Sequence, residues 1–271
     1  MSTSYWLDRS PQKEKKQYDA IIVGAGISGL SLAYWLNQED PTMKIAIIEK
    51  NRMAFGASGR NAGFITCGSV EHFNRMITKH GMQEATEIWR FSEDNLKLLK
   101  EHIIQDSGNI IEFRERGCYS LAMQDSEFKE LKNVTQVMLD LKIPVEVYDS
   151  TQIEKQVGAR NFVGGIKYLI DAETNPVLLL QLMQSRIRAD LYESTEAYGY
   201  SQTTEGTRIL NTDNGNFEAP MIIYALNGYS ANLHKFFEDK IFPTRGQILM
   251  LEPVAPFMDG PCYANFYLDY L

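Results

Sequence analysis

The feature that most constrains this chain is an apolar strand that ends in three closely spaced glycines and runs directly into a helical pattern. Residues 18–23 read YDAIIV, and GAGISG follows at 24–29. A second apolar segment, KIAIIE at 44–49, ends at Glu49. A strand, a glycine turn, a helix and an acid-ended second strand are the parts of a βαβ unit that binds a dinucleotide. The sequence therefore predicts such a unit over residues 18–49.

Each glycine of this turn has a physical task in a dinucleotide-binding unit. Gly24 permits the tight turn, Gly26 lets the backbone approach a pyrophosphate, and Gly29 lets the helix and strand pack closely. The helix dipole then faces the pyrophosphate, and Glu49 accepts hydrogen bonds from ribose hydroxyls. The cofactor contacts predicted from this motif are Gly24, Ala25, Gly26, Ile27, Ser28, Gly29, Glu49 and Lys50. For Lys50 the alternative is a solvated cation at the end of a strand.

A second glycine-rich stretch, GASGRNAG at 56–63, follows the second strand. Its small residues and consecutive amides can form a nest for anionic oxygens, Arg60 can add a positive charge, and Asn61 can bond to a ring edge. An NAD enzyme does not need such a loop, so the presence of the loop favours FAD as the dinucleotide. The alternative is an ordinary glycine-rich surface loop. The contacts predicted here are Gly56, Ala57, Ser58, Arg60, Asn61, Ala62, Gly63 and Phe64.

Together, IIVGAGISGLSLAYWL, the acid-ended strand and GASGRNAGF resemble the FAD-dependent D-amino-acid oxidase superfamily. Within it, the chain is most similar to the group of glycine oxidase, sarcosine oxidase and gamma-glutamylputrescine oxidoreductase. Later segments agree, namely DAETNPVLLLQLM, YESTEAYGY, IIYALNGYS and RGQILMLEP. The resemblance implies that the backbone near Glu196 and Ala197 meets the adenine. It also implies that Ala225, Asn227 and Gly228 form a turn near the FAD.

The resemblance implies an α/β fold with a Rossmann-type FAD-binding domain built on a parallel central sheet. An α+β substrate domain on a mixed or antiparallel sheet is interleaved with it. We expect an N-terminal arm at 1–17, the FAD-binding domain at 18–107 and 151–235, and the substrate domain at 108–150 and 236–271.

Local patterns add more detailed expectations. Asp-Asn-Gly at 213–215 predicts a hairpin turn. Residues 190–200 alternate like one strand, 221–228 read as a buried parallel strand, and 245–253 read as a further strand.

For chemistry, the resemblance implies oxidation of a C–N bond in an amine or amino acid, with hydride transfer to N5 of a non-covalently bound flavin. The cofactor supplies the difficult step, so no strong general base is required. Family loops that match residues 64–67 run beneath the flavin ring, where amide donors can stabilise charge. The candidate active-site residues are Thr66, Cys67, Arg245 and Tyr267. The alternatives are a packed thiol for Cys67 and an ordinary ion pair for Arg245.

Composition limits the partners of this chain. The net charge is −8 and there is no long basic run, which argues against nucleic acid and anionic membranes as partners. Residues 1–17 lack the apolar core of a signal peptide, and no apolar stretch approaches the length of a membrane span. The three cysteines, Cys67, Cys118 and Cys262, lack the spacing of a metal site or a disulfide scaffold. We therefore expect a cytoplasmic protein without a metal that acts on a small molecule.

Two alternative functions remain open. Members of the family continue past the point that matches 263–271, so we expect an incomplete substrate domain. The chain is then either an enzyme or a non-catalytic flavin-binding fragment or subunit that needs a complementing C-terminal chain. A tRNA-modifying flavin oxidoreductase domain is a further alternative, which the absence of a basic patch disfavours. A homodimer is expected from the resemblance alone.

Overall fold

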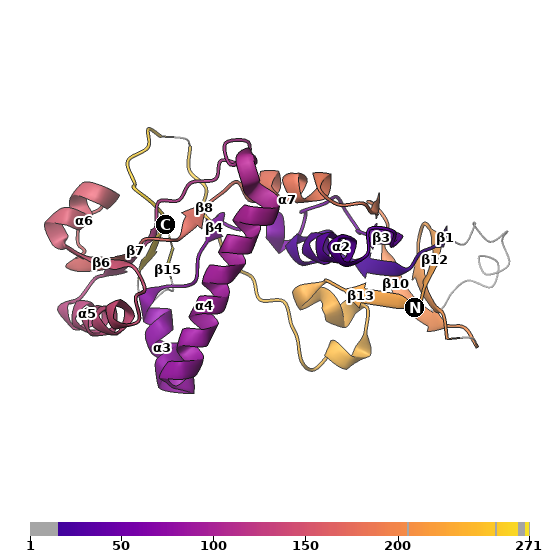
Figure 1. The fold of residues 1–271 in the computed structure, drawn as a ribbon, viewed down its shortest axis with the longest axis horizontal. Coiled ribbons are helices and arrows are strands. Elements are labelled where there is room, and N and C mark those ends of the chain that lie inside the picture. Colours follow the sequence, from indigo (N-terminus) through magenta and orange to yellow (C-terminus); the bar gives the residue numbers. More distant parts are fainter. Residues whose placement is uncertain (1–15, 205, 253, 265–268, 271) are drawn as a thin grey trace. The chain divides into compact units, whose positions relative to one another are not determined.

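The computed structural model describes residues 16–204, 206–252, 254–264 and 269–270. The chain forms two compact units, and each is made of two separate segments (Figure 1). Unit 1 comprises Met1–Asn61 and Leu179–Ile248, and unit 2 comprises Ala62–Leu178 and Leu249–Leu271. The expected interleaving is therefore present, although the units divide the chain at other places than the expected domains.

The first sheet of unit 1 is parallel and has the strand order β13-β2-β3-β9. Helix α2 (Ile27–Glu39) connects β2 to β3, so the predicted βαβ unit is present. The strands are β2 (Ala20–Val23), β3 (Ile45–Ile48), β9 (Asp190–Tyr192) and β13 (Met221–Tyr224). The expectation of a buried strand at 221–228 was wrong in part, because β13 is an edge strand and none of its residues is fully buried.

The second sheet of unit 1 has the order β1-β12-β11-β10. The hairpin of β11 and β12 confirms the turn predicted at 213–215, and Gly215 has a φ of +104°. The strands are β1 (Lys16–Gln17), β10 (Ala197–Gln202), β11 (Arg208–Thr212) and β12 (Gly215–Ala219). Lys16 and Gln17, expected in the arm, pair with β12 instead.

The single strand expected at 190–200 is two strands in two sheets. The chain breaks between β9 and β10, where Ser194 has a left-handed φ of +50° and its amide bonds to the carbonyl of Asn51. Side chains of the parallel sheet, among them Ile21 and Ile48, pack against Leu210 and Phe217 of the second sheet. Unit 1 is thus layered as a helix, a parallel sheet and a mixed sheet, in which β1 and β12 are parallel and the other pairs are antiparallel.

Unit 2 is built on a five-stranded mixed sheet with the order β15-β14-β5-β7-β6. Only the β14–β5 pair is parallel among the described pairs of this sheet. The strands are β5 (Cys118–Ala122), β6 (Val145–Asp149), β7 (Gly164–Tyr168), β14 (Cys262–Ala264) and β15 (Asp269–Tyr270). A separate antiparallel pair joins β4 (Phe64–Ile65) to β8 (Ala172–Glu173). The fold class expected from the sequence is therefore confirmed.

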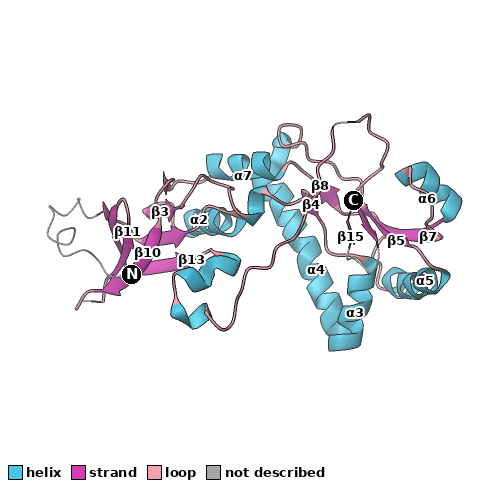
Figure 2. Cartoon of the chain, turned by 180° about the vertical axis from the view of Figure 1, so that it is seen from behind, coloured by secondary structure: helices cyan, strands magenta, loops and turns pink. Residues whose placement is uncertain are grey.

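The helices of unit 2 cover both faces of its mixed sheet (Figure 2). They are α3 (Val70–His80), α4 (Met82–Leu98), α5 (Asp125–Asp140) and α6 (Ser150–Val157), and α7 (Pro176–Ser185) leads the chain back to unit 1. Trp89 on α4 is fully buried, and its ring meets those of Phe73 and Tyr168 edge-on, each with a distance of 5.2 Å between ring centroids. This packing places α3 and α4 in unit 2, whereas we expected residues 70–98 in the FAD-binding domain.

The strand expected at 245–253 is not formed over residues 245–252. Leu249, Met250 and Leu251 are 83%, 90% and 76% exposed. None of the helices in the described ranges is both long enough and apolar enough to cross a lipid bilayer. The same ranges contain no group of three or more acidic, histidine or cysteine side chains that is arranged to hold a metal ion.

Candidate functional site

The glycine turn of unit 1 lies at the carboxyl end of β2, where the strand order reverses. From β2 the chain continues to β3 on one side, while β13 lies on the other side. Gly24 has a φ of +111°, and a Cβ added to it would lie 2.6 Å from the carbonyl oxygen of Ala225. A Cβ on Gly29 would overlap the carbonyl oxygen of Gly24. The turn is therefore at the place where open α/β sheets bind ligands, and these two positions accept only glycine.

The amino end of α2 is joined to the second glycine-rich loop through Ser58. Gly26 is the N-cap of α2 and offers no side chain, but the Ile27 amide donates to Ser58 Oγ at 2.9 Å. A Cβ on Gly26 would lie 2.8 Å from the same hydroxyl. Ile27 and Ser28 are exposed, which leaves the first turn of α2 open to a ligand.

We expect Ser58→Ala to lower the free energy of unfolding of the cofactor-free chain by about 1 kcal/mol, because the Ile27 amide loses its acceptor. Urea unfolding followed by circular dichroism measures this change. Ser28→Ala is the control, because Ser28 is exposed in the same turn. A Ser58→Ala variant as stable as the parent chain would contradict a stabilising role for this bond.

Glu49 at the end of β3 closes the turn from the other side. Its Oε2 accepts the Ala25 amide at 3.0 Å, and its Oε1 accepts the Asn51 amide at 3.0 Å. The half-buried carboxylate is thus fixed beside the glycine turn. Lys50 points elsewhere and forms an exposed ion pair with Glu196 at 2.7 Å.

The second loop is held by its own hydrogen bonds. Residues Ala57–Gly59 form the short 3₁₀ helix η1, in which the Gly59 and Arg60 amides bond to the carbonyls of Gly56 and Ala57. The side-chain amide of Asn61 donates to the Ala57 and Ser58 carbonyls, at 3.2 and 2.7 Å. Two of the consecutive amides that were expected to bind anionic oxygens, those of Gly59 and Arg60, are therefore used within η1. Arg60 lies over the Phe55 ring, 4.4 Å from its centroid.

The remaining predicted contacts of unit 1 lie after β13 and at the start of β10, which begins at Ala197. The Ala225 amide donates to the Val23 carbonyl at 2.8 Å, which holds the end of β13 beside the glycine turn. Asn227 has a φ of +46° and begins the 3₁₀ helix η4 (Asn227–Asn232), which also contains Gly228. The backbone N–H of Glu196 bonds to the Asp213 carboxylate, and its C=O accepts the Asp213 amide.

Unit 2 holds the other predicted residues that follow the loop. Gly63 has a φ of +82° and passes so close to Thr174 that a Cβ would overlap its carbonyl oxygen. Thr66 Oγ1 lies 2.7 Å from Tyr263 Oη, and the ring of Phe64 meets that of Tyr263 edge-on at 5.7 Å. Phe64 and Thr66 are thus packed around Tyr263, a residue that the sequence alone did not point to.

Cys67 lies at the inner end of a chain of polar groups in unit 2. Its Sγ lies 3.8 Å from Tyr168 Oη, which donates to Glu93 at 2.5 Å, and Glu93 pairs with Arg90 at 2.5 Å. Burial, with the nearby Asp171 carboxyl, raises the pKa of the Cys67 thiol to about 12. The thiol is therefore protonated at neutral pH and is not a nucleophile there.

The two other candidate active-site residues are not brought into this group. Arg245 is exposed in the extended segment of unit 1 that was expected to be a strand. Tyr267 lies outside the described residues. Sequence reasoning also missed Asp171 and Glu93 as site residues. Asp171 opens the segment DAETNPVLLLQLM, which supported only the resemblance, and only the tertiary fold brings the two acids near Cys67.

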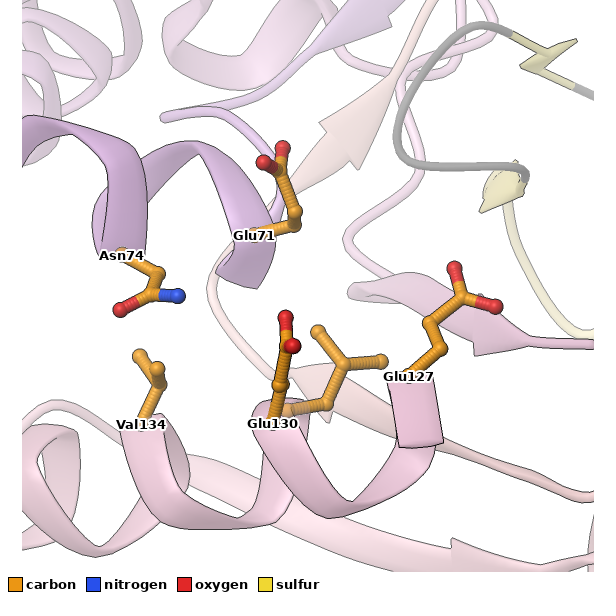
Figure 3. A pocket seen from close by; sticks show the side chains of 6 residues that line it. Glu71, Asn74, Glu127, Glu130 and Val134 are labelled. Atoms are coloured by element: carbon orange, nitrogen blue, oxygen red, sulfur yellow. The ribbon is translucent and has the colours of Figure 1, made fainter. Parts of the chain in front are cut away.

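A small acidic pocket lies apart from these residues, between α3 and α5 of unit 2 (Figure 3). Glu130 and Val134 on α5 point toward α3, which carries Glu71 and Asn74. Glu71 pairs with Arg75 at 2.8 Å, and Glu127 accepts the Met123 amide at 2.8 Å. These contacts account for two of its three carboxylates as parts of the helix packing.

Comparison with known proteins shows similarity over nearly the whole chain. The beta subunit of sarcosine oxidase from Rhodobacter capsulatus is 25% identical over 288 residues, which cover 98% of this chain and 63% of the relative. Gamma-glutamylputrescine oxidoreductase from Escherichia coli is 23% identical over 215 residues, which cover 78% of this chain and 49% of the relative. The chain thus spans less than two thirds of the length of these relatives.

Among solved structures, glycine oxidase from Geobacillus kaustophilus has the same fold. It superposes with a TM-score of 0.67 at 20% identity, over 92% of this chain and 66% of that one. The family model of the FAD-dependent oxidoreductases named DAO matches residues 19–269. The resemblance drawn from the sequence is confirmed, and the chain belongs to the DAO family of FAD-dependent oxidoreductases.

Proposed function

We propose that this chain binds FAD non-covalently through unit 1 and serves the oxidation of a C–N bond in a small amine or amino acid. The observation that carries the proposal is the glycine turn at the carboxyl end of β2. There the backbone leaves no room for a Cβ at Gly24 and Gly29, and the Glu49 carboxylate is fixed beside them. This arrangement fits the pyrophosphate and ribose of a dinucleotide.

The residues that would hold FAD come from three strand ends. The amino end of α2 offers its exposed first turn, Ser58 offers a hydroxyl already aimed at that turn, and Glu49 offers carboxylate oxygens to the ribose. Ala225 and Asn227 follow β13, and Ala225 lies beside the glycine turn. When bound, the flavin supplies the hydride acceptor, which no protein side chain can replace.

The proposed reaction requires little acid–base catalysis by side chains of this protein. Cys67 is a neutral thiol, so we propose that Thr66 and Cys67 contribute shape and hydrogen bonds beside the reacting groups. Arg245 is exposed and can pair with a substrate carboxylate in the complete active site. Covalent attachment of the flavin forms no part of the proposal.

The visible spectrum of the chain tests the proposal. The purified chain is mixed with FAD, passed through a desalting column and examined for flavin absorption. Glycine, sarcosine, a D-amino acid and a polyamine derivative are then added without oxygen. We expect a yellow protein that one of these amines bleaches and that 2-hydroxy acids of similar size do not. A colourless protein would refute FAD binding by this chain.

A second candidate function is a flavin-binding chain whose substrate side is completed by another polypeptide. The exposed apolar residues Leu249, Met250 and Leu251 favour it, because an extended apolar segment without strand partners is a template for pairing. A yellow protein that no amine bleaches would support this second function over the first.

A further inference from the structure

Asp171 is a fully buried acid between β7 and β8 that no part of the proposed chemistry uses. Its backbone carbonyl accepts the Gly117 amide at 2.9 Å. Its Oδ1 accepts the backbone amide of Cys67 at 3.0 Å. The side chain therefore reaches from the start of β8 to the residues that follow β4.

The second oxygen of this carboxyl, Oδ2, is buried without a hydrogen-bond partner. Asp171 also has no ion-pair partner among the described residues, and Lys167, a buried cation of β7, pairs with Asp259 at 2.7 Å. A charged carboxylate with one hydrogen bond and no counter-ion is costly in such surroundings. The structure therefore suits the neutral acid better than the carboxylate.

Among the groups around Asp171, Glu93 increases this preference, while the hydrogen bond from the Cys67 amide opposes it. The groups are Glu93 from α4, Cys67 after β4, Cys118 from β5 and Tyr263 from β14, while Tyr168 of β7 bonds to Glu93. None of these groups carries a positive charge. Burial, together with the charge of Glu93, holds the pKa of Asp171 well above its ordinary range.

Asp171 is placed where it can fix the segment from Phe64 to Cys67. The β4–β8 pair ends with Ile65 opposite Ala172, so the ladder stops directly beside Asp171. Beyond that point, the Cys67 amide bonds to Asp171, the Thr66 hydroxyl lies against Tyr263, and Cys67 Sγ makes a longer contact of 3.8 Å with Tyr168 Oη. The Asp171 carboxyl thus adds one hydrogen bond beyond the end of the β4–β8 ladder. The residue that it holds, Cys67, is one that the proposed function places near the flavin.

We propose that Asp171 is a positioning residue, kept as a neutral carboxylic acid, which holds the Cys67 backbone and with it the segment after β4. The link of this segment to the flavin rests on the proposed function. The neutral state and the hold on Cys67 do not, and both can be measured without FAD.

Two substitutions of Asp171 separate the effect of its hydrogen bond to the Cys67 amide from the effect of its ionisation. Asp171→Asn keeps an oxygen for the Cys67 amide and cannot ionise, whereas Asp171→Ala removes the acceptor. Asp94→Asn is the control, because Asp94 is exposed on α4 of the same unit. Hydrogen–deuterium exchange of peptides that contain residues 63–69 reports the bond. In Asp171→Ala we expect the exchange rate of the Cys67 amide to be at least roughly tenfold higher than in the parent. In the other two variants we expect the same rate as in the parent.

The pH dependence of thermal stability shows whether the Asp171 carboxyl is protonated in the folded chain. A carboxyl whose folded pKa is raised gives its full stabilisation below about pH 4 and loses it as the pH rises toward the folded pKa. We therefore expect the thermal midpoint of the parent and of Asp94→Asn to fall between pH 5 and 8 more steeply than that of Asp171→Asn. An infrared band of a protonated carboxyl should be present in the parent at pH 7 and missing in Asp171→Asn.

Two results would overturn the proposal. One is an Asp171→Asn variant in which both the pH dependence of the thermal midpoint and the protonated carboxyl band are the same as in the parent. The other is parental exchange at Cys67 in a folded Asp171→Ala variant. If Asp171→Ala does not fold, the band and the pH dependence of Asp171→Asn still decide. A chain that fails to bind FAD would refute the proposed function and leave these measurements on the cofactor-free chain valid.

Discussion

The Gly29→Ala variant is expected to lose about 2 to 3 kcal/mol of unfolding free energy and to elute from a desalting column without FAD. A Cβ at this position overlaps the carbonyl oxygen of Gly24, a backbone atom that cannot move without shifting β2 or α2. Alanine gains about 1 kcal/mol in helix propensity, which offsets only part of the steric cost. Because α2 must move away from β2, the amino end of the helix no longer faces the place of the pyrophosphate.

Urea unfolding measures the stability of this variant, and flavin absorption after desalting measures binding. Gly56→Ala is the matched control, since no atom lies within 4 Å of the Cβ it would add and its φ of −75° suits alanine. Both substitutions add one methyl group to the predicted cofactor motifs, so a difference between them reports local geometry. A Gly29→Ala chain that binds FAD like Gly56→Ala would mean that close packing of α2 on β2 is not needed for the cofactor.

Glu49→Gln is expected to weaken FAD binding roughly 10- to 100-fold, since a hydrogen bond to a charged group contributes about 1.5 to 3 kcal/mol. The carboxylate has two oxygens, which accept the Ala25 and Asn51 amides and retain lone pairs for ribose hydroxyls. Glutamine replaces one oxygen with a donor, so one backbone amide faces an NH₂ group instead of an acceptor. Quenching of FAD fluorescence during titration measures the affinity.

Glu39→Gln provides the control for this titration. Glu39 is exposed at the last turn of α2 and undergoes the same loss of charge without touching the glycine turn. Circular dichroism at the titration temperature shows whether Glu49→Gln remains folded. Equal affinities for FAD in the two variants would remove Glu49 from the cofactor site.

The features that could be predicted from the sequence are those that local chemistry determines. Gly24 and Gly29 stand where a left-handed φ and a helix–strand contact exclude every other residue, and the hairpin at 213–215 follows from its own turn residues. Such constraints act within a few residues of the chain. They therefore leave a pattern that can be read without knowledge of the rest of the fold.

The features that were missed or misread depend on distant partners. Asp171 opens a segment that supported only the resemblance, and its burial beside Cys67 and Glu93 arises only in the tertiary fold. Residues 190–200 alternate like one strand because both halves are strands, although the left-handed Ser194 sends them into different sheets. Residues 245–252 have the composition of a strand, but a strand forms only where a neighbour offers hydrogen bonds.

The pairing of β2 with β13 joins Val23 to Tyr224 and has a consequence for how the chain is made. A ribosome that adds about 5 to 20 residues per second needs roughly 10 to 40 seconds between the synthesis of β3 and that of β13. During this time, β2 has β3 as its only parallel neighbour within the strands already made, and its other edge is open. The hydrogen bond from the Ala225 amide to the Val23 carbonyl, beside the glycine turn, can therefore form only after β13 has been synthesised. Premature pairing of the open edge of β2 is thus the step at which we expect newly made chains to misfold or to need a chaperone.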